Sequence, residues 1–435
     1  MSFSEWKKYR VGDIAKVKNG FAFKGKDFIS SGAPVIKIKN VKPGKILLDD
    51  LSYVSREVAD KASKYKINVG DILITMSGNR IDGSPDSWVG KVAMFREEGE
   101  YLLNQRVGII EINSKKIDSI FLSYLLSSIQ TQQHFITKAN SSGGQANISP
   151  DIIHDTEFFA PELPEQKQIA SILRSIDETI ENNQQINKTL EEMAKAIFKE
   201  WFVDFNFPNA TGKFQETEIG KIPVGWKVTT FEDVFDADRG LSYKGAGLAE
   251  SDATPMHNLN SVLEGGGYKT IGIKFYSGEY KDKHIVNAGE VIVANTEQGH
   301  KHLLIGYPAI VPQFYGEHGI FSHHIYRLRP KPNCYLSPVY IFHLLLQTQV
   351  REQVIGFANG TTVNMLKIEG LQKPKFAMPP KELAEKFTAI AQANQLQSEQ
   401  NIEENQTLMN LRDTLLPKLM KGEIEINSKA DVAKV

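Results

Sequence analysis

The sequence predicts an α+β protein of two similar mixed α/β domains separated by a long antiparallel helical coiled coil. Three observations predict this fold. The chain repeats itself at an offset of about 220 residues, each copy holds short apolar runs bounded by Gly, Pro and Asn, and each copy ends in a long helical pattern. The 435 residues are enough for several domains that each bury a core.

The repeat consists of blocks that keep their order and spacing. The identical residues of the first block are Trp6, Lys7, Asp13, Gly20, Lys24 and Gly25, which recur as Trp226, Lys227, Asp233, Gly240, Lys244 and Gly245. Later blocks match residues 67–74 with 286–293, 103–107 with 321–325, and 146–148 with 363–365. Because chance similarity between unrelated α/β segments rarely stays collinear, the blocks indicate an internal duplication. We expect domains at 1–160 and 214–378, helical segments at 161–213 and 379–425, and a flexible tail at 426–435.

The first helical segment has apolar residues at alternating spacings of three and four, as in a coiled-coil seam. Pro164 marks its start, Phe205 to Pro208 its end, and about 40 residues extend roughly 60 Å. The second helix, from about Glu382 to Met420, has a more polar seam, so the two helices are expected to pack on each other. An amphipathic helix lying on its own domain is the alternative interpretation. The predicted seam and subunit-contact residues are Ile169, Ile172, Ile176, Asn183, Ile186, Leu190, Met193 and Ile197, with Leu408, Leu411 and Leu415 in the second helix.

Composition excludes several classes of protein. With 41% hydrophobic and 24% charged residues, the chain is neither disordered nor fibrous. Cys334 is the only cysteine, which rules out an internal disulfide and a cysteine-rich zinc site and favours a reducing compartment. The polar N-terminus and the lack of a long apolar run predict no signal peptide and no membrane span, hence a cytoplasmic protein.

Charge is nearly balanced overall, with 51 Lys and Arg against 52 Asp and Glu. It is unevenly distributed, because residues 1–160 hold 22 basic against 18 acidic side chains. This mild local excess fits either a nucleic-acid surface or an ordinary solvated one.

Motifs for catalysis are missing. The sequence contains no phosphate-binding loop, no Gly-x-Gly-x-x-Gly and no Gly-x-Ser-x-Gly, and Pro379-Pro380 is followed by Lys381 instead of the aromatic residue that amino-methyltransferases use. Eight of the ten histidines lie between 214 and 378, but no cysteine or acidic residue accompanies them at ligand spacing. We therefore expect a non-catalytic chain with no metal site and no cofactor of its own, although a histidine metal site is the open alternative.

Polar loop residues are the better candidates for function. Asn and Gln amides match the hydrogen-bonding edge of adenine, Arg matches that of guanine, and Lys side chains suit phosphates. Surface loops are rich in such residues in any protein, which is the competing interpretation. The candidate DNA-binding residues are Lys24, Lys37, Lys39, Asn79, Arg80, Asn104, Gln105, Arg106, Gln145 and Asn147 in the first copy, and Lys244, Asn295, His300, Lys301, His323, His324 and Asn364 in the second.

In this order, the motifs resemble the specificity subunit of a type I restriction-modification system. Residues 69–74 (Val-Gly-Asp-Ile-Leu-Ile), 103–107 (Leu-Asn-Gln-Arg-Val) and 164–170 (Pro-Glu-Gln-Lys-Gln-Ile-Ala) carry the resemblance, and 411–422 match the usual closing helix. The second copy departs from the pattern, since Pro380-Lys381 replaces the Pro-Glu start and His323-His324 replaces Gln-Arg.

The resemblance implies a role that composition does not show. Two target-recognition domains would read the two halves of a split DNA sequence, and the helices would set the spacing and dock two methyltransferase (M) subunits. Those partners would methylate adenine at N6 with S-adenosylmethionine, and restriction (R) subunits that use ATP and Mg would translocate DNA. The rival hypothesis is a coiled-coil adaptor whose globular domains bind proteins; a fused enzyme would need a further domain.

Overall fold

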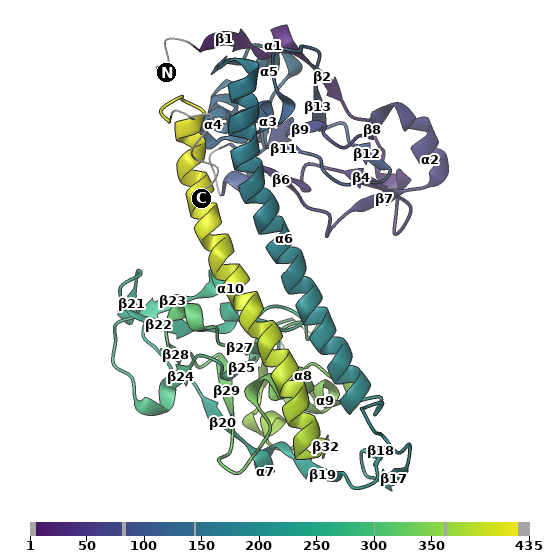
Figure 1. Cartoon of the computed structure of the whole chain (residues 1–435), viewed down its shortest axis with the longest axis vertical. Helices are drawn as coiled ribbons and strands as arrows, with labels where there is room; N and C mark the ends of the chain where they lie inside the picture. The colour runs from purple at the N-terminus through teal and green to yellow at the C-terminus, as the bar shows by residue number, and fades with distance from the viewer. Residues whose placement is uncertain (1–5, 81–83, 143–144, 300, 361–362, 425–435) are drawn as a thin grey trace. The chain divides into compact units, whose positions relative to one another are not determined.

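The computed structural model describes residues 6–80, 84–142, 145–299, 301–360 and 363–424. It divides into two compact units, one of residues 1–180 with 406–435 and the other of 181–405 (Figure 1). Each unit joins a globular α+β part to segments of the same two long helices. The predicted tail at 426–435 lies outside the described residues.

The globular part of the first unit is made of small sheets. The five-stranded sheet has the order β3(Phe28–Ile29)-β7(Ser52–Val54)-β4(Ala33–Ile36)-β12(Tyr101–Leu103)-β8(Lys66–Ile67). The four-stranded sheet has the order β11(Val92–Met94)-β9(Ile72–Thr75)-β13(Val107–Ile112)-β2(Ala15–Asn19). The three-stranded sheet has the order β10(Ser77–Gly78)-β15(Gln145–Asn147)-β14(Asn140–Ser142). Two-stranded pairs are β1(Lys7–Arg10) with β16(Glu157–Ala160) and β5(Val41–Lys42) with β6(Lys45–Ile46). The α-helices are α1(Val11–Ile14), α2(Arg56–Lys61), α3(Ser119–Ser127), α4(Ile129–Lys138) and α5(Pro150–His154).

The second unit repeats the three sheets of the first with the same strand order. Its five-stranded sheet has the order β21(Leu248–Ala249)-β23(Lys274–Tyr276)-β22(Thr254–His257)-β28(His318–Phe321)-β24(Ile285–Asn287). Its four-stranded sheet has the order β27(Pro308–Ile310)-β25(Val291–Ala294)-β29(Ile325–Pro330)-β20(Phe235–Arg239). Its three-stranded sheet has the order β26(Thr296–Gln298)-β31(Val363–Leu366)-β30(Ala358–Asn359). The pairs are β19(Lys227–Thr230) with β32(Lys375–Met378) and β17(Phe214–Thr217) with β18(Gly220–Pro223), and the helices are α7(Phe231–Val234), α8(Pro338–Leu345) and α9(Thr348–Ile355). In both units the five-stranded sheet has a parallel pair, β4 with β12 and β22 with β28. The predicted duplication is therefore confirmed.

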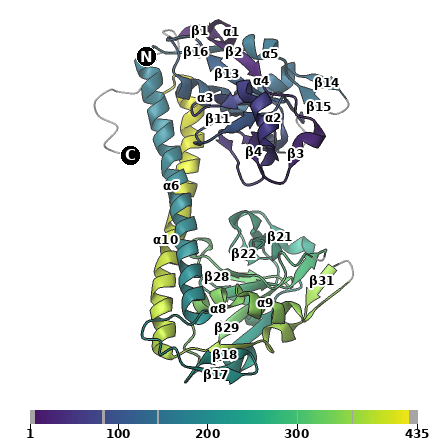
Figure 2. The same cartoon turned by 90° about the vertical axis from the view of Figure 1, so that its right-hand side faces the viewer.

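The two long helices are α6(Leu163–Phe202) and α10(Lys381–Leu419), of 40 and 39 residues. They run antiparallel and side by side within each unit (Figures 1 and 2). Both enter the globular cores. Leu173 of α6 and Leu419 of α10 are buried in the first unit, and Phe198 of α6 and Phe387 of α10 in the second. Each unit therefore needs both helices to complete its core.

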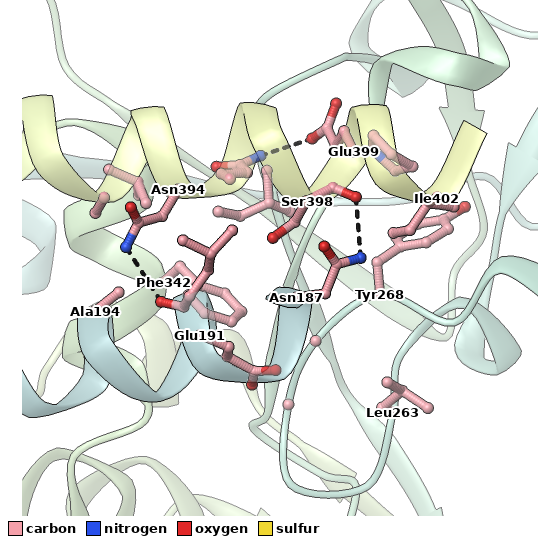
Figure 3. A pocket seen from close by; sticks show the side chains of 18 of the residues that line it. Asn187, Glu191, Ala194, Leu263, Tyr268, Phe342, Asn394, Ser398, Glu399 and Ile402 are labelled. Carbon is pink, nitrogen blue, oxygen red and sulfur yellow. Dashed lines mark hydrogen bonds between the residues drawn. The ribbon is translucent and has the colours of Figure 1, made fainter. Parts of the chain in front are cut away.

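Amide side chains pair the helices in the second unit. Asn183 donates from Nδ2 to Oδ1 of Asn405 at 3.0 Å, and Asn401 donates to Oδ1 of Asn187 at 2.7 Å. Asn187 also donates to the carbonyl of Ser398 at 3.2 Å, beside a pocket of about 250 Å³ (Figure 3). Because a buried amide needs a partner, these pairs fix which residues of the two helices lie opposite.

The predicted seam is confirmed in part. Ile169, Ile176 and Asn183 are buried. Ile186 and Met193, however, are 45% and 49% exposed, so they are not part of a buried seam between the two helices, and their role as subunit contacts stays a prediction; Leu173, Ile180, Ala194 and Phe198 are buried instead. The physical reason is that α6 packs on both α10 and the globular parts, which turns a different face inward from the one a two-helix seam requires. The remaining predicted positions, Ile172, Leu190, Ile197, Leu408, Leu411 and Leu415, are half-buried.

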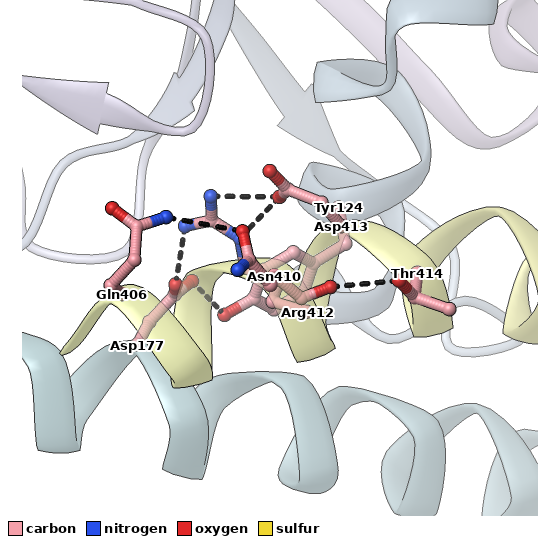
Figure 4. Close-up of polar contacts among 7 residues, drawn as sticks. All are labelled: Tyr124, Asp177, Gln406, Asn410, Arg412, Asp413 and Thr414. Carbon is pink, nitrogen blue, oxygen red and sulfur yellow. Dashed lines mark hydrogen bonds and ion pairs between the residues drawn. The ribbon is translucent and has the colours of Figure 1, made fainter. Parts of the chain in front are cut away.

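A polar contact ties the first unit to its helices. The Tyr124 hydroxyl of α3 donates to Asp177 of α6 at 2.6 Å, and Asp177 pairs with Arg412 of α10 at 2.9 Å (Figure 4).

The residue that corresponds to Tyr124 in the second unit is His343 of α8, which stacks on Phe198 and is 4% exposed. Among the described residues, Nδ1 of His343 has no hydrogen-bond partner. Burial lowers the pKa of His343 to about 3.

The recurrence of Gly20 as Gly240 has a steric cause. A Cβ at Gly20 would lie 2.3 Å from the carbonyl oxygen of Asn104, and one at Gly240 2.2 Å from that of Ser322. Gly25 and Gly245, identical in the same block, have nothing within 4 Å of the position that a Cβ would occupy. Only the first pair is therefore required by close backbone approach.

We expect Gly20→Ala and Gly240→Ala each to lower the free energy of unfolding by about 1–3 kcal/mol, because the backbones must separate. Gly25→Ala and Gly245→Ala are the matched controls and should change it by less than about 0.5 kcal/mol. Urea unfolding followed by circular dichroism measures the difference. Equal effects in both pairs would contradict the steric account.

We expect His343→Phe to make the protein less sensitive to acid. Between pH 6.5 and about 3 the unfolded chain binds a proton at His343 that the folded chain does not, so stability falls as the pH drops. The loss of unfolding free energy between pH 7 and pH 5 should shrink by about 2 kcal/mol in the variant. Urea unfolding at the two pH values measures it, with a Phe substitution of the exposed His134 as control. An unchanged pH dependence in His343→Phe would refute the prediction.

Candidate nucleic-acid interface

In the first unit, the small sheet β10-β15-β14 brings several predicted residues together. Arg106 donates from Nη1 to Oε1 of Gln145 at 3.0 Å, and the Ser77 hydroxyl donates to Oδ1 of Asn147 at 2.7 Å. Asn79, which follows β10, has an exposed side chain, as does Arg106. We call Asn79, Arg80, Arg106, Gln145 and Asn147 the first polar surface; Arg80 is also exposed.

A second group of predicted residues lies at the end of β12. Asn104 forms a parallel bridge with Phe21, and the backbone N–H of Gln105 donates to the carbonyl of Phe21 at 2.9 Å. Gln105 and Lys24 are exposed and Asn104 is half-buried. Asn104 also links to the first polar surface, because its Oδ1 accepts from the backbone N–H of Arg106 at 3.4 Å.

The remaining predicted lysines of this unit already have partners. The Lys37 ammonium lies 4.5 Å from the centroid of the Phe28 ring, and Lys39 forms an ion pair with Asp50 at 2.6 Å. Since Lys39 is 42% and Asp50 82% exposed in their side chains, that pair is weak and a phosphate could replace the carboxylate.

In the second unit, the histidines gather beside the sheet β26-β31-β30. The ring centroids of His323 and His324 are 3.9 Å apart, and Nδ1 of His324 is hydrogen-bonded to the Thr296 hydroxyl at 3.0 Å. Burial, followed by the charges of His323, Lys274 and Arg239, lowers the pKa of His324. At neutral pH its imidazole is therefore a neutral hydrogen-bonding group. Lys301 and Lys244 are exposed, and His300 lies outside the described residues.

Two of the predicted DNA-binding residues of the second unit are buried. Asn295 is 2% exposed and donates to the carbonyl of His323 at 2.9 Å, and Asn364 is 4% exposed and donates to the carbonyl of Gly299. Both amides hold neighbouring backbone and present almost no surface, so they are unsuited to contact DNA directly. Contact of these two amides with DNA stays a prediction, and residue type alone did not reveal their burial.

Buried groups that sequence reasoning did not single out shape the same region. Glu297 of β26 accepts hydrogen bonds from the backbone N–H groups of Leu303, Leu304 and Ile305 at 2.9, 3.1 and 3.0 Å. Burial opposes its ionisation, but the three N–H donors outweigh it, and the pKa of Glu297 is lowered. An acidic residue three positions after the apolar run 291–294 was the available signal.

Within the described residues, no group of three or more His, Cys, Asp and Glu side chains is placed to hold a metal ion. Cys334 is half-buried, and burial raises the pKa of its thiol. No described helix has the length and apolar character that crossing a membrane requires.

Comparison with known proteins bears on both units. The family model described as type I restriction modification DNA specificity domain matches residues 3–192 and again 223–404. Among curated relatives, the putative type I restriction enzyme MjaX specificity subunit of Methanocaldococcus jannaschii is 31% identical over 52% of this chain and 51% of its own length. The chain thus spans about half the length of that relative.

Two matches extend over nearly the whole chain. The type I restriction enzyme MjaIX specificity subunit of Methanocaldococcus jannaschii is 23% identical over 97% of this chain and 94% of its own. The crystal structure of a type I restriction-modification system S subunit from M. genitalium superposes with a TM-score of 0.60 at 15% identity, covering 97% of both chains, which shows a shared fold. The two family matches together cover most of the sequence. The chain therefore belongs to the family of type I restriction-modification DNA specificity proteins and carries the family's domain twice.

Proposed function

We propose that this chain is the sequence-reading subunit of a type I restriction-modification complex and that each unit reads one half of a split DNA target. The observation that carries the proposal is the duplication itself. Two domains of the same topology each present polar side chains beside a small three-stranded sheet, Arg106 and Gln145 in the first and His323 and His324 in the second. Because these side chains differ, the two halves of the target differ in sequence.

The chemistry of the two surfaces suits base reading. Arg106 and Gln145 offer a guanidinium and an amide, the groups that make bidentate contacts with guanine and adenine in the major groove. His324, with its lowered pKa, offers a neutral ring nitrogen to a base edge. The exposed Lys24, Lys244 and Lys301 suit the phosphates on either side.

The helices suit a spacing role. α6 and α10 are each continuous and contribute residues to both units. A helix of about 40 residues extends roughly 60 Å, and one DNA turn is about 34–36 Å, so we propose that the helices set the number of unread bases between the half-targets.

We propose further that this chain carries out no chemistry. Two methyltransferase subunits would dock along the helices, where the exposed apolar Ile186, Met193 and Leu396 are available, and restriction subunits would join them. S-adenosylmethionine, ATP and Mg would be bound by those partners, and the complex would act on DNA in the cytoplasm.

The test is co-expression of the chain with a type I methyltransferase subunit that forms a complex with it, followed by mapping of N6-methyladenine by single-molecule sequencing. We expect one split motif with a methylated adenine in each half and a constant gap. A continuous motif would contradict reading by two domains. A stable complex without any sequence-dependent methylation would favour the protein-binding adaptor.

A further inference from the structure

A buried glutamine holds a loop of the first polar surface. Gln132 of α4 is 2% exposed, and its Nε2 donates to the carbonyls of Pro85 at 3.2 Å and Val89 at 3.4 Å. The backbone of Val89 in turn donates to the carbonyl of Asn79 at 2.9 Å, and the backbone N–H of Asn79 donates to the carbonyl of Ser87 at 2.9 Å. Gln132 is therefore connected to the exposed Asn79 through two hydrogen bonds.

A buried lysine supports the same segment. Lys91 is 5% exposed and donates from Nζ to the carbonyl of Asp86 at 2.9 Å and that of Ile38 at 3.0 Å. The segment 84–89 is thus anchored from two sides by side chains that point away from solvent.

The second unit has an equivalent anchor of different chemistry. Arg351 of α9 is 9% exposed, and its guanidinium donates to the carbonyls of His302 at 3.0 Å and Ile305 at 3.4 Å. It lies 3.3 Å from the centroid of the Tyr307 ring. Glu297 holds the amides of the same segment, 301–305, while Arg351 holds its carbonyls.

The two anchors occupy matching places in the repeat. Gln132 and Arg351 lie on the second helix of a matching pair, α3 with α4 and α8 with α9. The segments they hold connect β10 to β11 and β26 to β27, strands at the same places in the two topologies. The duplication has therefore kept the anchoring of this loop while the anchoring residue changed.

Both anchors come at an energetic cost. Oε1 of Gln132 is buried and has no hydrogen-bond partner among the described residues. Arg351 keeps a cation largely out of water. Leaving a polar atom unpaired or burying a charge is unfavourable, which a merely space-filling position would avoid by carrying an apolar residue. The segment 84–89 pairs with the candidate DNA contact Asn79 through the bridge between Asn79 and Trp88, and the segment 301–305 contains the candidate contact Lys301.

We propose that Gln132 and Arg351 are positioning residues that set the backbone geometry of segments 84–89 and 301–305 and thereby the base preference of one half-target each. The proposal rests on the proposed function, because it assumes that each unit reads one half. Neither side chain touches DNA; each acts through the carbonyls that it holds.

The experiment uses the complex of the full chain with its methyltransferase subunit and compares base preference at every position of the methylated motif. Gln132→Met and Arg351→Met remove the donors while keeping an unbranched side chain. Gln353→Met is the matched control, because Gln353 of α9 bonds the backbone of Lys375 at 3.0 and 2.8 Å and not the loop. Arg351→Lys, which keeps a donor, tests rescue.

We expect Gln132→Met to reduce the preference for the target base over the other bases about tenfold, at one or more positions of one half-target only. Arg351→Met should have the same effect in the other half-target. Gln353→Met should leave both halves unchanged even if it lowers the melting temperature, and Arg351→Lys should restore part of the preference. If Gln132→Met does not fold, the Arg351 variants with their control decide the question.

Unchanged preference in a folded Arg351→Met complex would overturn the proposal, and so would equal relaxation of both halves by one variant. Failure of the wild-type complex to methylate a split motif would instead contradict the proposed function, so the two failures are distinguishable.

Discussion

The structure depends on the register between α6 and α10. Asn183 with Asn405 and Asn187 with Asn401 place four amides between the helices, and a slip of one turn would keep at most one of these two pairs. Apolar seams tolerate such slips better, because one leucine contact resembles the next. Each globular core also contains residues of both helices; for example, Leu419 of α10 lies in the core of the first unit and Phe198 of α6 in that of the second. The register between the helices therefore determines which part of each helix lies in which core.

The duplication separates what the scaffold needs from what each copy does. Strand order, the parallel pair and the close approach at Gly20 and Gly240 are common to both units. The polar residues differ at equivalent places, with Tyr124 against His343 as an example. Such a pattern suits a protein in which two similar frames carry two different binding surfaces.

Much of the fold could be predicted from the sequence because it depends on periodic features. The repeat blocks predicted two copies of one topology, and the boundaries of the long helices agree with the structure within a few residues. Ile186 and Met193 are not part of the buried seam, since a spacing rule for two isolated helices does not include a third packing partner. The site was less predictable. Asn295 and Asn364 have the right chemistry but are buried, and Gln132 belongs to no motif and acquires its role only from the loop that it holds.

The most direct test of the central claim changes the length of the helix pair without changing either unit's surface. Duplicating residues 180–186 in α6 together with 402–408 in α10 adds one heptad to each helix and repeats the Asn183–Asn405 pair. The added length is about 10 Å, or about three base pairs of DNA. Mapping of N6-methyladenine should then show both half-targets unchanged and the gap between them longer by about three bases. Unchanged half-targets with an unchanged gap would contradict the account.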